Sequence, residues 1–117
     1  MAKDKKNLFV YGSLKKGYLL HNFYLSKSKF IAQDSVKGEM YDLGSYPAYI
    51  EGEGVVHGEV YEVGSKEFES VKNMEESAGY ETINIKTKGG MDVYIFSYKD
   101  ESIRSRCKLI NNYVKQK

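Results

Sequence analysis

The chain has 117 residues and a net charge of +2, and 41% of its residues are hydrophobic. A chain of this length fits one domain, because two halves would each be too small to bury a stable core, so we expect a single domain over residues 1–117. The eighteen basic and sixteen acidic residues are mostly interspersed and create no field that would attract a polyanion. Nucleic acid is therefore not the default partner, and we expect the protein to bind none.

The few cysteine and histidine residues restrict the chemistry further. Cys107 is the only cysteine, and the two histidines, His21 and His57, are far apart in the sequence. One cysteine cannot form an internal disulfide, and this set does not make a zinc site. We therefore expect both histidines to be structural or exposed to solvent, and the protein to need no metal and no other cofactor.

Apolar runs are short throughout the chain. A helix that crosses a bilayer needs about 20 apolar residues, and a signal peptide needs an apolar stretch after its charged start. Neither pattern is present, so we expect a cytoplasmic protein that makes no contact with membranes. We also expect it to act as a monomer.

The first half of the chain is rich in short β-prone runs. Eleven tyrosines and five phenylalanines, with no tryptophan, suit half-buried strands. A turn at 12–13 follows the first run, residues 14–25 support only a short or broken helix, and 51–54 is expected to turn the chain. Gly38 is expected to mark a bulge or a close backbone approach. The strands are expected at residues 8–11, 30–31, 36–41, 48–50 and 55–63.

The second half contains the best helix. Ser65 is a candidate N-cap for residues 66–76, in which Phe68, Val71 and Met74 to Glu75 follow helical spacing. Ala78-Gly79 ends this helix. Residues 80–87 and 91–98 then predict a β-hairpin around the turn at 88–90.

The tail is ambiguous, because residues 103–114 have helical spacing while 108–110 could add an edge strand. The order of elements predicts an α+β fold, in which a small bent β-barrel, mixed or antiparallel, carries one main helix packed against it.

The first turn is a candidate anion site. The segment Tyr11-Gly12-Ser13-Leu14 offers consecutive backbone N–H groups directly after a strand, and such groups can converge on a carboxylate or a phosphate. Neither the Walker spacing nor the dinucleotide fingerprint is present, so a nucleotide is not favoured. An ordinary tight turn explains the same residues. Tyr46-Pro47 could line the rim of a pocket, although a rigid turn accounts for it equally well.

Two carboxylates at the end of the predicted helix offer acid–base chemistry. Glu75 follows Val71 by four residues and shares the buried stripe, whereas Glu76 lies about 100° further round the helix. We therefore expect Glu75 to point inward. A carboxylate near the negative end of a helix dipole is harder to ionise, which suits a general base, but an exposed surface pair simply tolerates that position.

Four segments together resemble one known family. Residues 8–17 closely resemble the opening signature of the γ-glutamyl cyclotransferase-like family, which includes γ-glutamylamine cyclotransferases and plant avirulence-induced proteins. Residues 40–48 and 56–63 are similar to its second and third blocks. Residues 71–75 resemble the end of the helix that carries the family's catalytic carboxylate.

The resemblance implies a fold, a reaction and a set of roles. The reaction is an intramolecular acyl transfer, in which the amine of a small γ-glutamyl compound attacks its own γ-carbonyl, forms 5-oxoproline and releases an amine or amino acid. In this reading Glu75 shuttles the proton, the backbone of Gly12, Ser13 and Leu14 binds the substrate carboxylate, and Tyr11 positions the substrate or the loop.

Two other functions stay open at this point. Residues 80–82 and the tail depart from the family pattern, so the chain could be a catalytically altered protein of the same fold that binds a small anion or metabolite. An RNA-binding protein that uses the basic tail is a third hypothesis, and it predicts salt-dependent binding of oligonucleotides.

Overall fold

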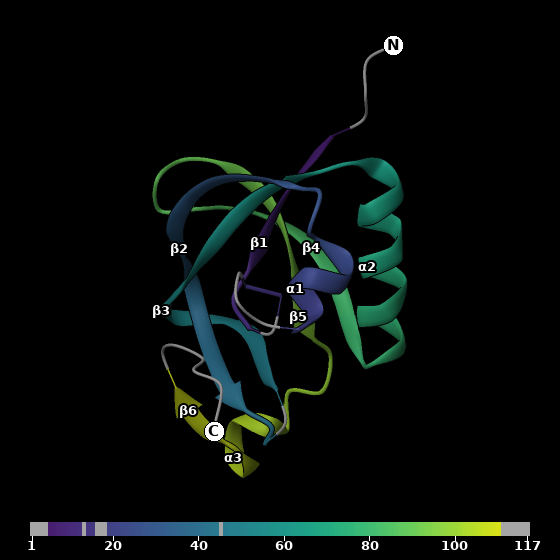
Figure 1. Ribbon diagram of the computed structural model, residues 1–117. Helices are drawn as coiled ribbons and strands as arrows, with labels where there is room; N and C mark the ends of the chain where they lie inside the picture. The colour runs from purple at the N-terminus through teal and green to yellow at the C-terminus, as the bar shows by residue number, and fades with distance from the viewer. Residues whose placement is uncertain (1–4, 13, 16–18, 45, 111–117) are drawn as a thin grey trace.

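The computed structural model describes residues 5–12, 14–15, 19–44 and 46–110, and it contains one sheet with helices at its side and end (Figure 1). The six strands lie in the order β4-β5-β1-β3-β2-β6. The strands are β1 (Lys6–Val10), β2 (Lys29–Asp42), β3 (Pro47–Val63), β4 (Tyr80–Lys86), β5 (Asp92–Tyr98) and β6 (Lys108–Ile110). The helices are α1 (Leu19–Tyr24), α2 (Ser65–Ser77) and α3 (Ile103–Arg106).

The sheet is mixed and strongly bent. Strand β1 pairs antiparallel with β3 and parallel with β5, while β2 and β3 form a long antiparallel pair that curves around the domain (Figure 1). The main helix, α2, packs against one side of this half-barrel. The expected α+β fold with a bent sheet, mixed or antiparallel, is confirmed, and the sheet is mixed. Helix α1 lies within residues 14–25, where only a short or broken helix was expected, and α3 lies in the tail.

Strand β1 is the central strand of the core. Leu8 and Val10 belong to one apolar cluster and Phe9 to another, because neighbouring side chains of a strand point to opposite faces. All three are buried. A strand that is covered on both faces needs a continuous apolar run, which explains the sequence Leu-Phe-Val at this position.

The expected turn at Glu51–Gly54 is wrong, because β3 runs through it without reversing. On the paired strands, Glu39 lies opposite Ile50 and Lys37 lies opposite Val55. The four residues Glu51–Gly54 of β3 therefore face Gly38 alone on β2. The ring of Tyr49 occupies the place where a Cβ of Gly38 would stand. The glycine-rich segment therefore bends the strand pair as a bulge, which confirms the expectation for Gly38.

Helix α2 forms where the apolar spacing predicts it, but its cap differs. The N-cap is Gly64, whose extended backbone (φ −65°, ψ 159°) accepts a hydrogen bond from the Phe68 N–H at 2.8 Å, and Ser65 is the first helical residue. The prediction that Ser65 caps the helix is therefore wrong. The helix ends at Ser77, and Gly79 follows with φ +103°, a backbone angle that favours glycine.

The tail contains both of the elements that its pattern allowed. Helix α3 is followed by β6, which adds an antiparallel edge strand to β2, and residues 111–117 lie outside the described part. Arg104 fixes α3 to the sheet, because its guanidinium donates to Glu39 Oε1 and to the Glu51 carbonyl, both at 2.6 Å. The β4–β5 hairpin also forms as predicted. In the described part of the chain, the helices are all too short or too polar to span a bilayer.

Candidate active site

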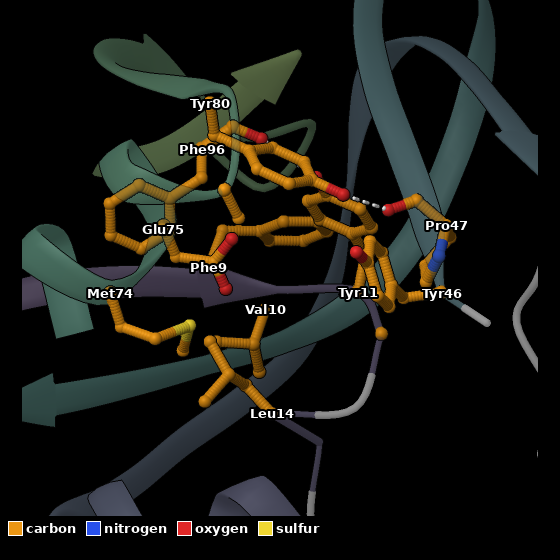
Figure 2. A pocket seen from close by; sticks show the side chains of 12 residues that line it. Phe9, Val10, Tyr11, Leu14, Tyr46, Pro47, Met74, Glu75, Tyr80 and Phe96 are labelled. Carbon is orange, nitrogen blue, oxygen red and sulfur yellow. Dashed lines mark hydrogen bonds between the residues drawn. The ribbon is translucent and has the colours of Figure 1, made fainter. Parts of the chain in front are cut away.

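A cavity of about 150 Å³ opens where the end of β1 meets the start of β3 and the last turn of α2 (Figure 2). Strands β4 and β5 supply its remaining wall. The described lining residues are Phe9, Val10, Tyr11, Gly12, Leu14, Tyr46, Pro47, Met74, Glu75, Ala78, Tyr80 and Phe96. Most of these side chains are apolar, so a bound molecule would lose much of its contact with water.

The loop after β1 reaches the cavity because residue 12 is glycine. A Cβ at Gly12 would stand 2.7 Å from Cγ of Pro47, closer than two carbon atoms can pack, so another residue here would push the loop away from β3. The N–H of Lys15 donates to the Gly12 carbonyl at 2.9 Å and closes a tight turn. Leu14, inside this turn, is buried against the cavity.

Glu75 enters the cavity from the last turn of α2. Its side chain is partly buried, and this burial raises the pKa of the carboxyl from an ordinary value of 4.5 to about 7. Glu76 is exposed and lies on another face, where it pairs with Lys72 at 3.4 Å and accepts a hydrogen bond from Thr82 Oγ1 at 3.1 Å. The helical geometry that separates the two carboxylates is therefore confirmed.

Two buried tyrosines hold the walls of the cavity together. The hydroxyl of Tyr11 donates to the Phe96 carbonyl at 2.7 Å and accepts from the Tyr49 N–H at 3.2 Å. The hydroxyl of Tyr80 donates to the Pro47 carbonyl at 2.7 Å, as the dashed line in Figure 2 shows. The first pair of bonds joins the loop after β1 to β5 and β3, and the second joins β4 to β3.

Both phenols are protonated donors and not bases. Burial raises the pKa of Tyr11 well above its ordinary value, and electrostatic interactions with Tyr80 and Glu75 raise it further. Burial, followed by the negative charge of Glu75, also raises the pKa of Tyr80. Among the described lining residues, Glu75 is thus the group whose carboxyl titrates near neutral pH.

The cavity brings together most of the predicted site residues. Tyr11, Gly12, Leu14 and Glu75 all line it, although the last is far from the others in the sequence, while Ser13 lies outside the described residues. The expectation that Tyr46 and Pro47 line a pocket rim is also confirmed.

We expected each histidine to be either structural or exposed, and the structure shows one residue of each kind. His57 is exposed on β3, and His21 is buried beneath the loop.

Sequence reasoning missed several lining residues. Tyr80 carries a usable signal, because it directly follows the glycine that ends α2, so the chain turns it back toward Glu75. Phe96 carries none, since its place depends on the parallel pairing of β5 with β1. The described residues contain no group of three metal-binding side chains.

Comparison with known proteins gives a consistent result. The sequence profile described as "Gamma-glutamyl cyclotransferase, AIG2-like" matches residues 8–113. PH0828 of Pyrococcus horikoshii, which is named only provisionally as a gamma-glutamylcyclotransferase, is 37% identical over 89 residues, covering 75% of this chain and 76% of that protein. The Escherichia coli "Gamma-glutamylcyclotransferase family protein YtfP" is 37% identical over 59 residues, covering 48% of this chain and about half (50%) of that protein.

Solved structures share the fold. The crystal structure of PH0828 superposes with a TM-score of 0.72 at 32% identity and covers 81% of this chain and 79% of that one. The crystal structure of a mouse AIG2-like protein gives a TM-score of 0.78 at 19% identity over 94% of this chain and 88% of that one, which shows the fold alone. Because the profile match spans most of the sequence and includes the segments that build the cavity, the chain belongs to the gamma-glutamyl cyclotransferase, AIG2-like family.

Proposed function

We propose that the chain converts a small γ-glutamyl amine or peptide into 5-oxoproline and a free amine by intramolecular acyl transfer. One observation carries the proposal: a carboxyl whose pKa is about 7, Glu75, lines the same apolar cavity as the tight turn after β1. The turn offers backbone donors for a carboxylate, and Glu75 offers a group that can both accept and return a proton near neutral pH.

The bonds that form and break define what the site has to do. The α-amine nitrogen of the substrate forms a bond to its own γ-carbonyl carbon, and the proton that this nitrogen loses passes to the Glu75 carboxylate. The bond between that carbonyl carbon and the leaving nitrogen then breaks, and Glu75 returns the proton to the leaving nitrogen. The products are 5-oxoproline and the amine, and Glu75 ends ionised as it began.

The walls of the cavity support the same reaction. Ring closure requires the flexible glutamyl chain to be held folded, with its amine close to its own carbonyl. We assign the α-carboxylate to the backbone N–H groups of Gly12, Ser13 and Leu14. We assign to Tyr11 the positioning of that loop, which its bonds to Phe96 and Tyr49 support. The apolar lining excludes water, which favours ring closure over hydrolysis.

We assign contact with the leaving group to Tyr46, because it lines the cavity and is 45% exposed.

The direct test is to incubate the purified protein with γ-glutamyl amines and γ-glutamyl dipeptides and to measure 5-oxoproline and the released amine by mass spectrometry. Equal amounts of the two products, with rates proportional to the protein concentration, are expected. If no compound of the panel is turned over but 5-oxoproline binds measurably, the protein is a metabolite-binding protein of the same fold and not an enzyme of this type.

A further inference from the structure

A buried histidine lies directly beneath the loop of the proposed site. His21, in α1, is only 8% exposed, and its ring packs against the ring of Tyr61 with centroids 5.0 Å apart. Its Nδ1 lies 2.9 Å from the carbonyl oxygen of Leu14. A carbonyl oxygen can only accept a hydrogen bond, so Nδ1 carries the proton and donates it. His21 does not line the cavity, and the proton shuttle makes no use of it.

The hydrogen bond acts on one particular peptide group. The carbonyl of Leu14 and the N–H of Lys15 belong to the same planar unit. His21 holds its oxygen side, and the Gly12 carbonyl accepts its N–H at 2.9 Å on the other side. With both ends fixed, the plane of this peptide cannot rotate without breaking a hydrogen bond.

The fixed peptide sets the direction of its neighbours. The N–H of Leu14, one of the donors assigned to the substrate carboxylate, belongs to the residue whose carbonyl His21 holds, so its direction depends on the backbone angles of Leu14. A glycine at position 12 makes this turn easier to deform, because glycine has access to more backbone conformations than other residues. An anchor on the far side of the turn therefore limits how far its donors can move.

We propose that His21 is a positioning residue, which holds the peptide between Leu14 and Lys15 so that the turn presents its N–H groups to the substrate carboxylate. The proposal rests on the proposed function and extends it to a residue outside the cavity. A histidine that merely fills the core would contribute packing against Tyr61, whereas a positioning histidine contributes its Nδ1–H.

Two substitutions separate these roles. His21→Phe keeps an aromatic ring against Tyr61 and removes the donor, while His21→Asn keeps an N–H at the same number of bonds from the backbone and removes the ring. His57→Phe, at an exposed position of β3, is the matched control. All variants are first compared with the parent by circular dichroism and thermal unfolding.

Steady-state kinetics give the first measurement. In His21→Phe we expect KM to rise about tenfold, because one hydrogen bond that orders the binding loop is lost, while kcat stays within about threefold. The midpoint of the pH–rate profile of His21→Phe should be the same as that of the parent, because Glu75 sets it in both proteins. His21→Asn should restore KM to within about threefold of the parent, and His57→Phe should match it. A folded His21→Phe variant with the parent KM, or equal impairment in the phenylalanine and asparagine variants, would overturn the proposal.

Amide exchange gives a second measurement that needs no substrate. The Lys15 N–H is protected by the bond to Gly12, so its exchange rate in NMR reports on the turn. We expect it to exchange about tenfold faster in His21→Phe and at nearly the parent rate in His21→Asn. If the parent turns over none of the γ-glutamyl compounds, the proposed function fails, but this exchange pattern still decides whether His21 holds the turn. Unchanged exchange in His21→Phe would show that it does not.

Discussion

Replacing Glu75 by glutamine should stabilise the fold and remove the activity together. The pKa of this carboxyl is about 7 in the folded protein and 4.5 ordinarily, because burial disfavours its charged form. Below pH 4.5 the carboxyl is protonated in both the folded and unfolded states. As the pH rises toward 7, the unfolded state loses its proton first, so the folded protein loses stability; above pH 7 the loss is complete.

The size of this loss follows from the difference between the two pKa values. At 1.36 kcal/mol for each pKa unit, the parent should lose about 3 kcal/mol of unfolding free energy between pH 4 and pH 8 relative to Glu75→Gln, which stays neutral throughout. Urea unfolding of both proteins at a series of pH values measures this gap. A gap that stays constant with pH would show that the folded carboxyl is not shielded from water.

The same substitution tests the proposed chemistry. General acid–base catalysis accelerates a reaction by about 10²–10⁴-fold. The kcat of Glu75→Gln should therefore drop by a factor of about 10²–10⁴, while substrate affinity stays nearly unchanged. The kcat/KM of the parent should rise with pH through about 7 and then level off, as Glu75 loses its proton. Formation of 5-oxoproline, followed by mass spectrometry from pH 5 to 9, measures both quantities.

Glu76→Gln is the matched control, because its side chain is exposed on another face of α2. It should keep the rate within a few-fold of the parent and show no comparable pH-dependent gain in stability. If Glu76→Gln is inactive while Glu75→Gln stays active, the assignment of the proton shuttle to Glu75 is wrong. Full activity in both variants would require another base.

Three further substitutions test the walls of the cavity. Gly12→Ala should raise KM and destabilise the fold by about 1–3 kcal/mol, because its Cβ would meet Pro47 at 2.7 Å; thermal unfolding and kinetics measure both effects. Tyr80→Phe should cost about 1 kcal/mol in urea unfolding, because the Pro47 carbonyl loses its donor, and an unchanged stability would show that this bond is not formed. Tyr46→Ala should leave stability within about 0.5 kcal/mol, since Tyr46 is 45% exposed, but should change KM unequally among substrates with different leaving groups. Equal effects on every substrate would place the leaving group elsewhere.

The elements that were predicted correctly are those whose pattern is local. Phe68 and Val71 mark the buried face of α2 by their spacing alone, and the same spacing turns Glu75 inward. The β4–β5 hairpin follows from two β-prone runs around a glycine turn. These features require no knowledge of the rest of the chain.

Most of the features that sequence reasoning missed depend on distant partners. Glu51–Gly54 has the composition of a turn, but whether such a segment reverses or bulges is decided by its partner strand, where Gly38 leaves room for the ring of Tyr49. Ser65 resembles an N-cap, yet the helix begins at that residue, because the Gly64 carbonyl accepts its first hydrogen bond. The place of Phe96 in the cavity depends on parallel pairing between β1 and β5, which no local pattern encodes.

That parallel pairing has a consequence for the synthesis of the protein. Strand β1 is synthesised before β5, and Phe96 of β5 follows Tyr11 by 85 residues. At about 5–20 residues per second, one edge of β1 waits about 4–17 seconds for its neighbour. During that interval the backbone N–H and C=O groups on this edge of β1, next to the apolar side chains of Leu8, Phe9 and Val10, are open to pairing with another nascent chain. The cavity of the proposed active site is completed only after β5 has emerged, because Phe96 of β5 forms part of its wall.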